Sequence, residues 1–255
     1  MGRLKAFGIG EGAWKVPEGY LSSDSVCYSA GAGEDITFDV AIANQFGCDV
    51  HLFDPTPRAI AHFENLREQT LGGQSMLVGG KSHSYPIDDH TLDKLHFHPF
   101  GVYGSETTLR FYAPKDPSHV SHSVRNLQET ERFFEAKCKT VRSFMDQLGH
   151  DRLDLLKLDI EGAEHSVIDH LIGDCVRPRV LCIEFDSALQ QRRYGEAAMD
   201  VNRLVKFGYD LAEIRSWNAT LVARESAPRF STRLKMLRLN WQVKRKSRRA
   251  ARKAA

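Results

Sequence analysis

The sequence predicts an α/β fold, a doubly wound and mostly parallel sheet with helices on both faces. A short apolar strand, a glycine turn, a helix and a second strand follow one another over residues 25–53. Of two later apolar runs, 153–159 ends in Asp159, and 180–185 contains Glu184 near its end and is followed by Asp186. Strands that alternate with helices form parallel sheets, and such strands are apolar because both faces of the sheet are covered.

The first two strands and helices follow from composition. Residues 25–30 (SVCYSA) are β-branched and aromatic and lead into a glycine turn, and 49–53 (DVHLF) form the second strand. Between them, apolar residues recur at helical spacing from Glu34 until Gly47 ends the helix. A second helix spans 56–69, with a proline in its first turn and two glycines after its end.

The middle of the chain, residues 74–127, is less regular. We expect 95–103 and 107–112 to pair as a hairpin, because each is rich in aromatic and β-branched residues. The polar stretch 113–126, rich in Ser, His and Pro, is expected to form a loop over one edge of the sheet. A further strand is expected at 132–139.

Helices and strands alternate again in the last third. Glycines are expected to close two of the helices, and the last two strands are expected to run antiparallel. The predicted helices are 141–148, 163–171 and 196–207, and the predicted strands are 153–159, 180–185, 210–214 and 218–222.

With 255 residues, the chain is long enough for one large domain. We divide it into an N-terminal extension (1–23), an α/β domain (24–225) in which 74–127 form a substrate or lid region, and a basic tail (226–255). No run of about 18 apolar residues occurs, so no transmembrane helix is expected. The first residues lack the apolar core of a secretory signal. Five scattered cysteines without a CxxC pair suggest reduced thiols in a cytoplasmic protein.

Charge is distributed unevenly along the chain. The net charge is +2, yet residues 226–255 contain 11 Lys and Arg and no acid. The leucines at 234, 237 and 239 and Trp241 suggest a short amphipathic helix in this segment, and the end, KRKSRRAARKAA, is expected to be solvated or disordered. Residues 244–253 could contact a polyanion such as RNA, acidic polysaccharide or an anionic membrane surface. Alternatively, the tail only aids solubility.

The first candidate site is the turn SAGAGED, residues 29–35. Gly31 and Gly33 lack Cβ atoms, which lets the backbone turn sharply and a ligand approach closely. Glu34 and Asp35 would repel a pyrophosphate but suit a cationic ligand such as S-adenosylmethionine, with its ammonium and sulfonium groups. The alternative is a structural turn before a helix start, where acids are favoured.

A second candidate is Asp54, which ends the second strand about 20 residues after the glycine turn. A carboxylate at this place can accept hydrogen bonds from the two hydroxyls of a ribose. Asp54 could instead cap the helix that begins just after it. The interval between the glycine turn and this acid favours nucleoside binding.

A third group of candidates surrounds the segment LLKLDIEGAEH. Asp159 ends a strand, and Glu161 lies in the turn into the next helix. Glu184 and Asp186 repeat the pattern one strand later, whereas Lys157 inside the strand requires a partner. These acids could bind a metal, attract a cationic cofactor or hold a proton from a substrate hydroxyl. No metal is predicted, because no ligand spacing such as HxxxH accompanies them.

The segments GAGED, HLFDPTP, LLKLDIEGAEHSVI and LCIEFD resemble the FkbM-type methyltransferases, over about residues 24–190. The resemblance implies a class I methyltransferase with a seven-stranded Rossmann-like sheet and S-adenosyl-L-methionine as cofactor. It also implies methyl transfer to a hydroxyl oxygen of a sugar, glycan or natural product. Carried over by position, Gly31 and Gly33 line the cofactor turn, Asp54 holds the ribose, and Asp159 and Glu161 lie beside the methionine end.

The chain departs from the family pattern at two positions of the first motif. Ser29 stands where the family usually has an acid, and Asp35 stands at a later glycine. Glu34 or Asp35 is therefore expected to take over the ammonium contact. Phe100 lies where the adenine normally rests and is a candidate for stacking on it, with a buried core phenylalanine as the alternative.

Methyl transfer to oxygen usually requires a base. Asp159 is the first candidate because the architecture places it at the cleft, and His122 and His165 are the other two because histidine titrates near neutrality. A rival function is a non-catalytic Rossmann-like protein that binds RNA or an acidic glycan through its tail. The intact glycines, Asp54 and Asp159 favour the enzyme.

Overall fold

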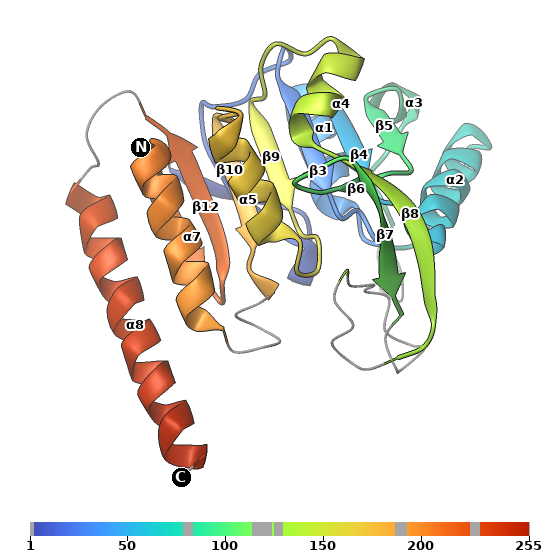
Figure 1. Cartoon of the computed structure of the whole chain (residues 1–255). Helices are drawn as coiled ribbons and strands as arrows, with labels where there is room; N and C mark the ends of the chain where they lie inside the picture. The colour runs from blue at the N-terminus through green and yellow to red at the C-terminus, as the bar shows by residue number, and fades with distance from the viewer. Residues whose placement is uncertain are drawn as a thin grey trace.

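The computed structural model describes residues 3–78, 84–113, 124, 130–186, 193–224 and 230–254 (Figure 1). Within these residues, seven strands form one sheet in the order β11-β12-β10-β9-β3-β4-β5. Their bounds are β3 (Val26–Ala30), β4 (Asp49–Phe53), β5 (Leu95–His98), β9 (Leu155–Leu158), β10 (Val180–Glu184), β11 (Tyr209–Arg215) and β12 (Asn218–Ala223).

Most of this sheet is parallel. The strands β5, β4, β3, β9 and β10 pair in parallel, and of the seven strands described, β12 alone runs against the others. The order reverses beside β3, where the chain passes from β5 to β9 on the other side. Ligands of open α/β sheets bind outside the carboxyl ends of the strands at such a reversal. The predicted fold class is confirmed.

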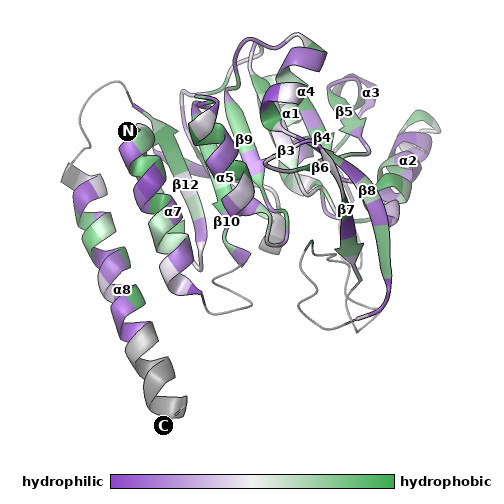
Figure 2. Cartoon of the chain, viewed as in Figure 1, coloured by the Kyte–Doolittle hydropathy of each residue, from purple (hydrophilic) through white to green (hydrophobic). Residues whose placement is uncertain are grey.

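Helices cover both faces of the sheet. One face carries α4 (Val141–Leu148), α5 (Glu164–Gly173) and α7 (Tyr194–Phe207), and the other carries α1 (Thr37–Phe46), α2 (Pro57–Leu71) and the short α3 (Asp89–Leu92). Neighbouring residues of one strand pack into the hydrophobic cores on opposite faces of the sheet: Leu156 packs toward α5, whereas Leu155 packs toward α1. The strands are accordingly hydrophobic along most of their length in Figure 2.

Three helices end where glycine was predicted to end them. Gly47, Gly149 and Gly208 follow α1, α4 and α7, and each has the left-handed backbone conformation. A residue with a side chain rarely adopts this conformation, so glycine stops the helix. Thr56 and Thr140 cap the first turns of α2 and α4 through their hydroxyl oxygens.

The first residues form a small antiparallel ribbon for which no element was predicted. It consists of β1 (Leu4–Phe7), a single 3₁₀ turn η1 (Gly10–Gly12) and β2 (Trp14–Pro17). Phe7, Trp14 and Val16 are buried in the same core as α1. This ribbon therefore packs directly on the domain and reaches the carboxyl ends of its strands.

The predicted hairpin of 95–103 with 107–112 is wrong. Residues 95–98 join the main sheet as β5, and β6 (Gly101–Val102), β8 (Phe133–Lys139) and β7 (Thr107–Tyr112) form a separate sheet in that order. Pro99 breaks the first run because proline has no N–H to donate, and Phe100 N–H turns back to the carbonyl of His98 at 2.8 Å. The partner of β7 is β8, the strand predicted at 132–139. Of the predicted loop 113–126, residues 114–123 and 125–126 lie outside the described residues.

The C-terminal segment is helical further than predicted. The helix α8 runs over Phe230–Ala254, so the expected disorder of the last basic stretch is contradicted up to Ala254. Lys, Arg, Leu and Ala favour helices, and no Gly or Pro follows Pro228 to interrupt them. Among the helices that the structure describes, none combines the length and apolar character needed to cross a membrane. All five cysteines, each within the described ranges, are free thiols.

Candidate functional site

A large cleft of about 1370 Å³ opens at the carboxyl ends of the central strands. The turns after β3, β4 and β9 form its floor, and the η1–β2 segment and the β11–β12 hairpin form its walls. Among the described residues, seven acids and four bases line it, so the cleft is acidic. The acids are Glu34, Asp35, Asp54, Asp159, Glu161, Glu184 and Glu213, and the bases are Lys15, Arg58, Lys157 and Arg215.

The two glycines of the first turn lack a side chain for different reasons. Both have positive φ, +82° at Gly31 and +56° at Gly33. A Cβ at Gly31 would lie 1.7 Å from the carbonyl oxygen of Asp159, whereas one at Gly33 would meet no described atom within 4 Å. Glycine at position 31 is thus required by the neighbouring loop, and glycine at 33 leaves open space above the floor of the cleft.

Asp54 is buried at the end of β4 and holds the glycine turn in place. One carboxylate oxygen accepts the N–H of Gly33 at 2.9 Å, and the other accepts the N–H of Thr56 at 2.8 Å. Asp54 therefore joins the two turns, and the helix cap itself is the hydroxyl of Thr56. Each carboxylate oxygen retains a second lone pair, so the side chain can still accept a hydrogen bond from a ligand.

The two acids that follow Gly33 have separate partners. Glu34 forms an ion pair at 2.6 Å with Arg58, which lies at the start of α2. Asp35 accepts hydrogen bonds from the N–H of Thr37 at 3.1 Å and its hydroxyl at 2.7 Å, at the start of α1. Asp35 thus has the helix-start role, whereas Glu34 remains a wall residue.

Lys157 is buried inside β9, and its ammonium group reaches the first turn. Its Nζ lies 3.0 Å from the carbonyl oxygen of Gly31 and 3.4 Å from Oδ2 of Asp159, and it lies over the Trp14 ring at 5.8 Å. Burial opposes its charge, but attraction to Asp159 and to the buried Asp39 outweighs this and raises the pKa of Lys157. The lysine is therefore a fixed positive charge.

Asp159 lies between this lysine and a second carboxyl group. Burial, together with the negative charge of Asp159, raises the pKa of Glu184 at the end of β10 to about 8. Near neutral pH, Glu184 accordingly keeps its proton. The positive charge of Lys157 lies beside Asp159, and the protonated Glu184 adds no negative charge to the cleft floor.

Two further acids lie behind the loop that follows β9. Glu164 and Asp186 are both buried, and burial raises the pKa of each. The Glu164 carboxylate accepts the N–H of Gly162 at 2.8 Å. Glu161, in the same loop, has a φ of +52°, which is uncommon for a residue with a side chain. This pair therefore supports a strained loop whose Glu161 lines the cleft.

A second titratable cluster lies on the α4 face, away from these acids. His51 Nδ1 and His98 Nε2 are 3.0 Å apart, and Tyr28 hydroxyl and His150 Nδ1 are 2.7 Å apart. Burial, followed by repulsion from the neighbouring histidines, lowers the pKa of His51 to about 3 and that of His98 to about 4. Among the described residues, no group of three or more His, Cys, Asp or Glu is placed to hold a metal ion.

The predicted site residues fall into three groups. Gly31, Gly33, Glu34, Asp54, Asp159 and Glu161 come together in the cleft. The described lining of the cleft does not include Phe100 or His165. His122 lies outside the described residues.

Phe100 and His165 have partners elsewhere. The Phe100 ring packs against Phe144 of α4, and the Lys139 ammonium lies 5.1 Å from the centre of the Phe100 ring. Phe100 thus packs against the hydrophobic core, which is the alternative that the sequence left open. His165 is oriented toward α7, where its Nδ1 lies 3.0 Å from Asp200. Both are therefore placed to stabilise packing between elements.

Several lining residues were missed from the sequence. Trp14 and Lys15 come from the N-terminal ribbon, and Asn218 comes from β12. The glycine-rich run GIGEG before AWKV was the available signal for the ribbon. The indole Nε1 of Trp14 and the amide Oδ1 of Asn218 have no hydrogen-bond partner among the described residues. Buried polar atoms without a partner are uncommon in folded proteins, so these two distinguish this wall from most of the core.

The cleft, the glycine turn and the acids at the strand ends agree with a sequence comparison. The family profile described as "Methyltransferase FkbM domain" matches residues 28–218, from β3 to the start of β12. The chain belongs to the FkbM methyltransferase family. Members of this family are methyltransferases, and membership implies S-adenosylmethionine as the methyl donor.

Curated relatives and solved structures carry related names. Probable methyltransferase-like protein 24 of Rattus norvegicus is 27% identical over 185 residues, and that of Homo sapiens is 26% identical over the same length. Each match covers 72% of this chain but only 38% of the relative. A precorrin-6y C5,15-methyltransferase from Geobacter metallireducens is similar with a TM-score of 0.39 and 12% identity, over 81% of this chain and 82% of the other. An O-methyltransferase family protein from Burkholderia thailandensis is similar with a TM-score of 0.37 and 11% identity. That match covers 83% of this chain and 54% of the other.

The residues of the cleft fit this cofactor. Asp54 keeps lone pairs that would accept hydrogen bonds from ribose hydroxyls, and the space above Gly33 leaves room for a ligand close to the backbone. The excess of acids along the lining suits a group that carries an ammonium and a sulfonium charge. A pyrophosphate-containing dinucleotide would be repelled by the same acids.

Proposed function

We propose that the FkbM domain of this chain transfers a methyl group from S-adenosylmethionine to a hydroxyl oxygen of a small molecule or glycan. The observation that carries the proposal is the position of Asp159, whose carboxylate lies 3.4 Å from the ammonium group of Lys157 and lines the cleft. The lysine holds this carboxylate at the floor of a cleft that suits the cofactor. A carboxylate at this place can accept a proton from a hydroxyl group.

On this proposal, Asp54 holds the ribose hydroxyls and the turn from Gly31 to Glu34 holds the methionine end. When bound, S-adenosylmethionine supplies an electrophilic methyl group on a sulfonium. Asp159 orients the acceptor hydroxyl and accepts the proton that the hydroxyl oxygen releases during methyl transfer. Lys157 fixes the position of this carboxylate. Glu184, which keeps its proton near neutral pH, places no second negative charge in the cleft beside it.

The acceptor would lie against the wall formed by the N-terminal ribbon and β12. Trp14 contributes an indole ring to this wall, and Asn218 contributes an amide side chain. Close by, Lys15 and Glu213 form an ion pair at 2.8 Å. Aromatic rings beside amide and charged groups suit a polyhydroxylated acceptor, which has apolar faces and many hydroxyls.

Calorimetry with S-adenosylmethionine and S-adenosylhomocysteine tests the cofactor site. Wild type is expected to bind both, and Asp54→Ala is expected to weaken binding about 10–100-fold, as loss of charge-assisted hydrogen bonds predicts. Asp88→Ala is the matched control, because Asp88 also accepts N–H and hydroxyl hydrogen bonds at a helix start but lies outside the cleft lining. Equal weakening in both variants, or no binding by folded wild type, would contradict the proposal.

A second experiment identifies the acceptor atom. Isotope-labelled S-adenosylmethionine is incubated with a panel of sugars, glycans and phenolic natural products, and labelled products are located by mass spectrometry and NMR. Label on a hydroxyl oxygen, lost in Asp159→Asn while cofactor binding is kept, is expected. Label found only on nitrogen or carbon atoms would exclude the hydroxyl acceptor and leave the cofactor site intact.

A further inference from the structure

The C-terminal helix α8 exposes a continuous apolar stripe. Leu234, Leu237 and Trp241 are 42%, 67% and 60% exposed. Their spacing of three and four residues places them on one face of the helix. Large apolar side chains gathered on one face of a helix mark a binding surface more often than isolated ones do.

Within the described residues, the fold does not bury this stripe. The opposite face of α8 carries the contacts to the domain, through the buried Met236 and Leu239, which pack in the same core as α7. Thr232 donates a hydrogen bond to Asp210 at 2.9 Å, and Lys235 donates one to the carbonyl of Leu211 at 3.1 Å. In Figure 1, α8 lies beside α7 at the edge of the molecule, so its outer face meets no other labelled element.

Basic residues border the stripe. Arg233, Arg238, Lys244 and Arg245 are all exposed on the described part of the helix, and the guanidinium of Arg245 lies 5.4 Å from the centre of the Trp241 ring. Residues 226–255 contain 11 Lys and Arg and no acid. A surface that combines apolar side chains with a dense positive charge matches an anionic membrane surface, which offers both an apolar layer and negative headgroups.

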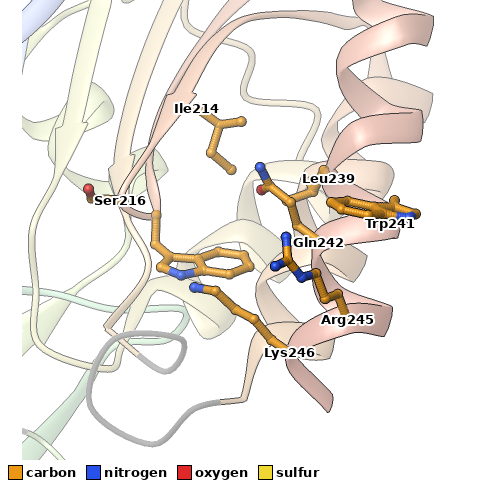
Figure 3. A pocket seen from close by; sticks show the side chains of 8 residues that line it. Ile214, Ser216, Leu239, Trp241, Gln242, Arg245 and Lys246 are labelled. Atoms are coloured by element: carbon orange, nitrogen blue, oxygen red, sulfur yellow. The ribbon is translucent and has the colours of Figure 1, made fainter. Parts of the chain in front are cut away.

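A groove of about 420 Å³ lies next to the stripe, between α8 and the β11–β12 hairpin. Figure 3 shows Trp241, Gln242, Arg245 and Lys246 along its helical side. Lys246 lies over the rings of Tyr194 and Trp217, at 4.5 Å and 5.0 Å from their centres. These contacts attach the basic half of the helix to the domain, so the helix is held in place before any partner binds.

We propose that α8 is a peripheral membrane anchor that binds anionic lipid surfaces, with Leu234, Leu237 and Trp241 in the interfacial layer and the flanking bases on the headgroups. RNA and acidic glycans share the negative charge but have no layer that aliphatic leucines can enter. The two exposed leucines therefore favour the membrane surface over these polyanions. The anchor is separate from the cleft and does not depend on the proposed methyl transfer.

Vesicle sedimentation with the full chain tests this anchor. Wild type is expected to bind phosphatidylcholine vesicles that contain about one third phosphatidylglycerol, and to bind pure phosphatidylcholine at least about tenfold more weakly. Leu237→Gln/Trp241→Gln is expected to lower binding to the anionic vesicles about tenfold or more, because it removes the apolar insertion. Leu71→Gln is the matched control: Leu71 is 60% exposed on α2, and its substitution is expected to leave binding unchanged.

Two further readouts separate lipid from other partners. Lipids brominated in their acyl chains are expected to quench tryptophan fluorescence in wild type but not in Trp241→Phe, because this ring enters the lipid. A single-stranded RNA oligonucleotide and heparin are titrated in parallel. Equal vesicle binding by wild type and the double variant, RNA binding without vesicle binding, or loss of a dimer in the double variant without loss of lipid binding would each overturn the proposal.

Discussion

The ammonium group of Lys157 donates a hydrogen bond to the main-chain carbonyl of Gly31, 3.0 Å away and 126 residues earlier in the chain. The same group lies 3.4 Å from the carboxylate of Asp159. One buried charge therefore connects the turn proposed to hold the cofactor with the acid proposed to act as base. The positions of both depend on it.

Replacing Lys157 with methionine is expected to destabilise the protein by about 3–5 kcal/mol, because it leaves the buried Asp39 and the nearby Asp159 without their positive partner. Urea unfolding measures this. Adding Asp39→Asn to the same chain should recover part of the loss, since a neutral side chain at 39 no longer needs the lysine. Lys15→Met, which breaks a partly exposed ion pair on the cleft wall, should cost less than about 1 kcal/mol. An equal loss of unfolding free energy in Lys157→Met and Lys15→Met would contradict this account.

A Gly31→Ala variant is expected to lose about 3 kcal/mol or more of stability, because the added Cβ overlaps the carbonyl oxygen of Asp159. Gly19→Ala separates this overlap from backbone strain. Gly19 has nearly the same φ, +80°, but open space where the Cβ would stand, so its cost should be about 1–2 kcal/mol. Denaturant midpoints that shift equally in the two variants would show that strain alone explains the effect.

The raised pKa of Glu184 predicts a loss of stability with rising pH. The folded protein binds a proton at Glu184 up to about pH 8, whereas the unfolded chain releases it near the ordinary value of 4.5. The stabilisation is thus complete below the unfolded pKa and disappears as the pH rises through the folded pKa. Unfolding free energies from pH 5 to 9 should decrease more steeply for wild type than for Glu184→Gln. Glu64→Gln, at an exposed position of α2, should show the same pH dependence of unfolding free energy as wild type.

The lowered pKa of His51 predicts the opposite dependence in acid. Between its ordinary pKa of 6.5 and its folded value of about 3, the unfolded chain binds more protons, so stability falls as the pH falls. The expected loss from this one buried residue between pH 7 and pH 5 is about 2 kcal/mol. His51→Gln should remove most of that loss, and His90→Gln, at an exposed position of α3, should not. Urea midpoints at the two pH values measure the difference.

Features that depend on local chemistry could be predicted from the sequence. The ends of α1, α4 and α7 follow from glycine, because only glycine enters the left-handed conformation at low cost. The parallel core follows from strands that are apolar on both faces. The grouping of Gly31, Asp54 and Asp159 follows from the rule that carboxyl ends of parallel strands meet at one edge.

Features that depend on distant contacts could not be predicted. The partner of β7 is β8 across an intervening stretch of chain, and no local pattern distinguishes it from a neighbouring strand. His51, His98 and His150 are widely separated in sequence, so their cluster is visible only once the sheet and α4 are assembled. Trp14 reaches the cleft because the N-terminal ribbon packs in the same core as α1, a contact that strand propensity does not encode.

The crowding at Gly31 has an evolutionary consequence. Since the carbonyl of Asp159 occupies the place of a side chain at 31, selection for folding alone preserves this glycine. A descendant that had lost methyl transfer would still keep this glycine. Glycine at 31 therefore marks the ancestry of a sequence rather than the survival of its catalysis.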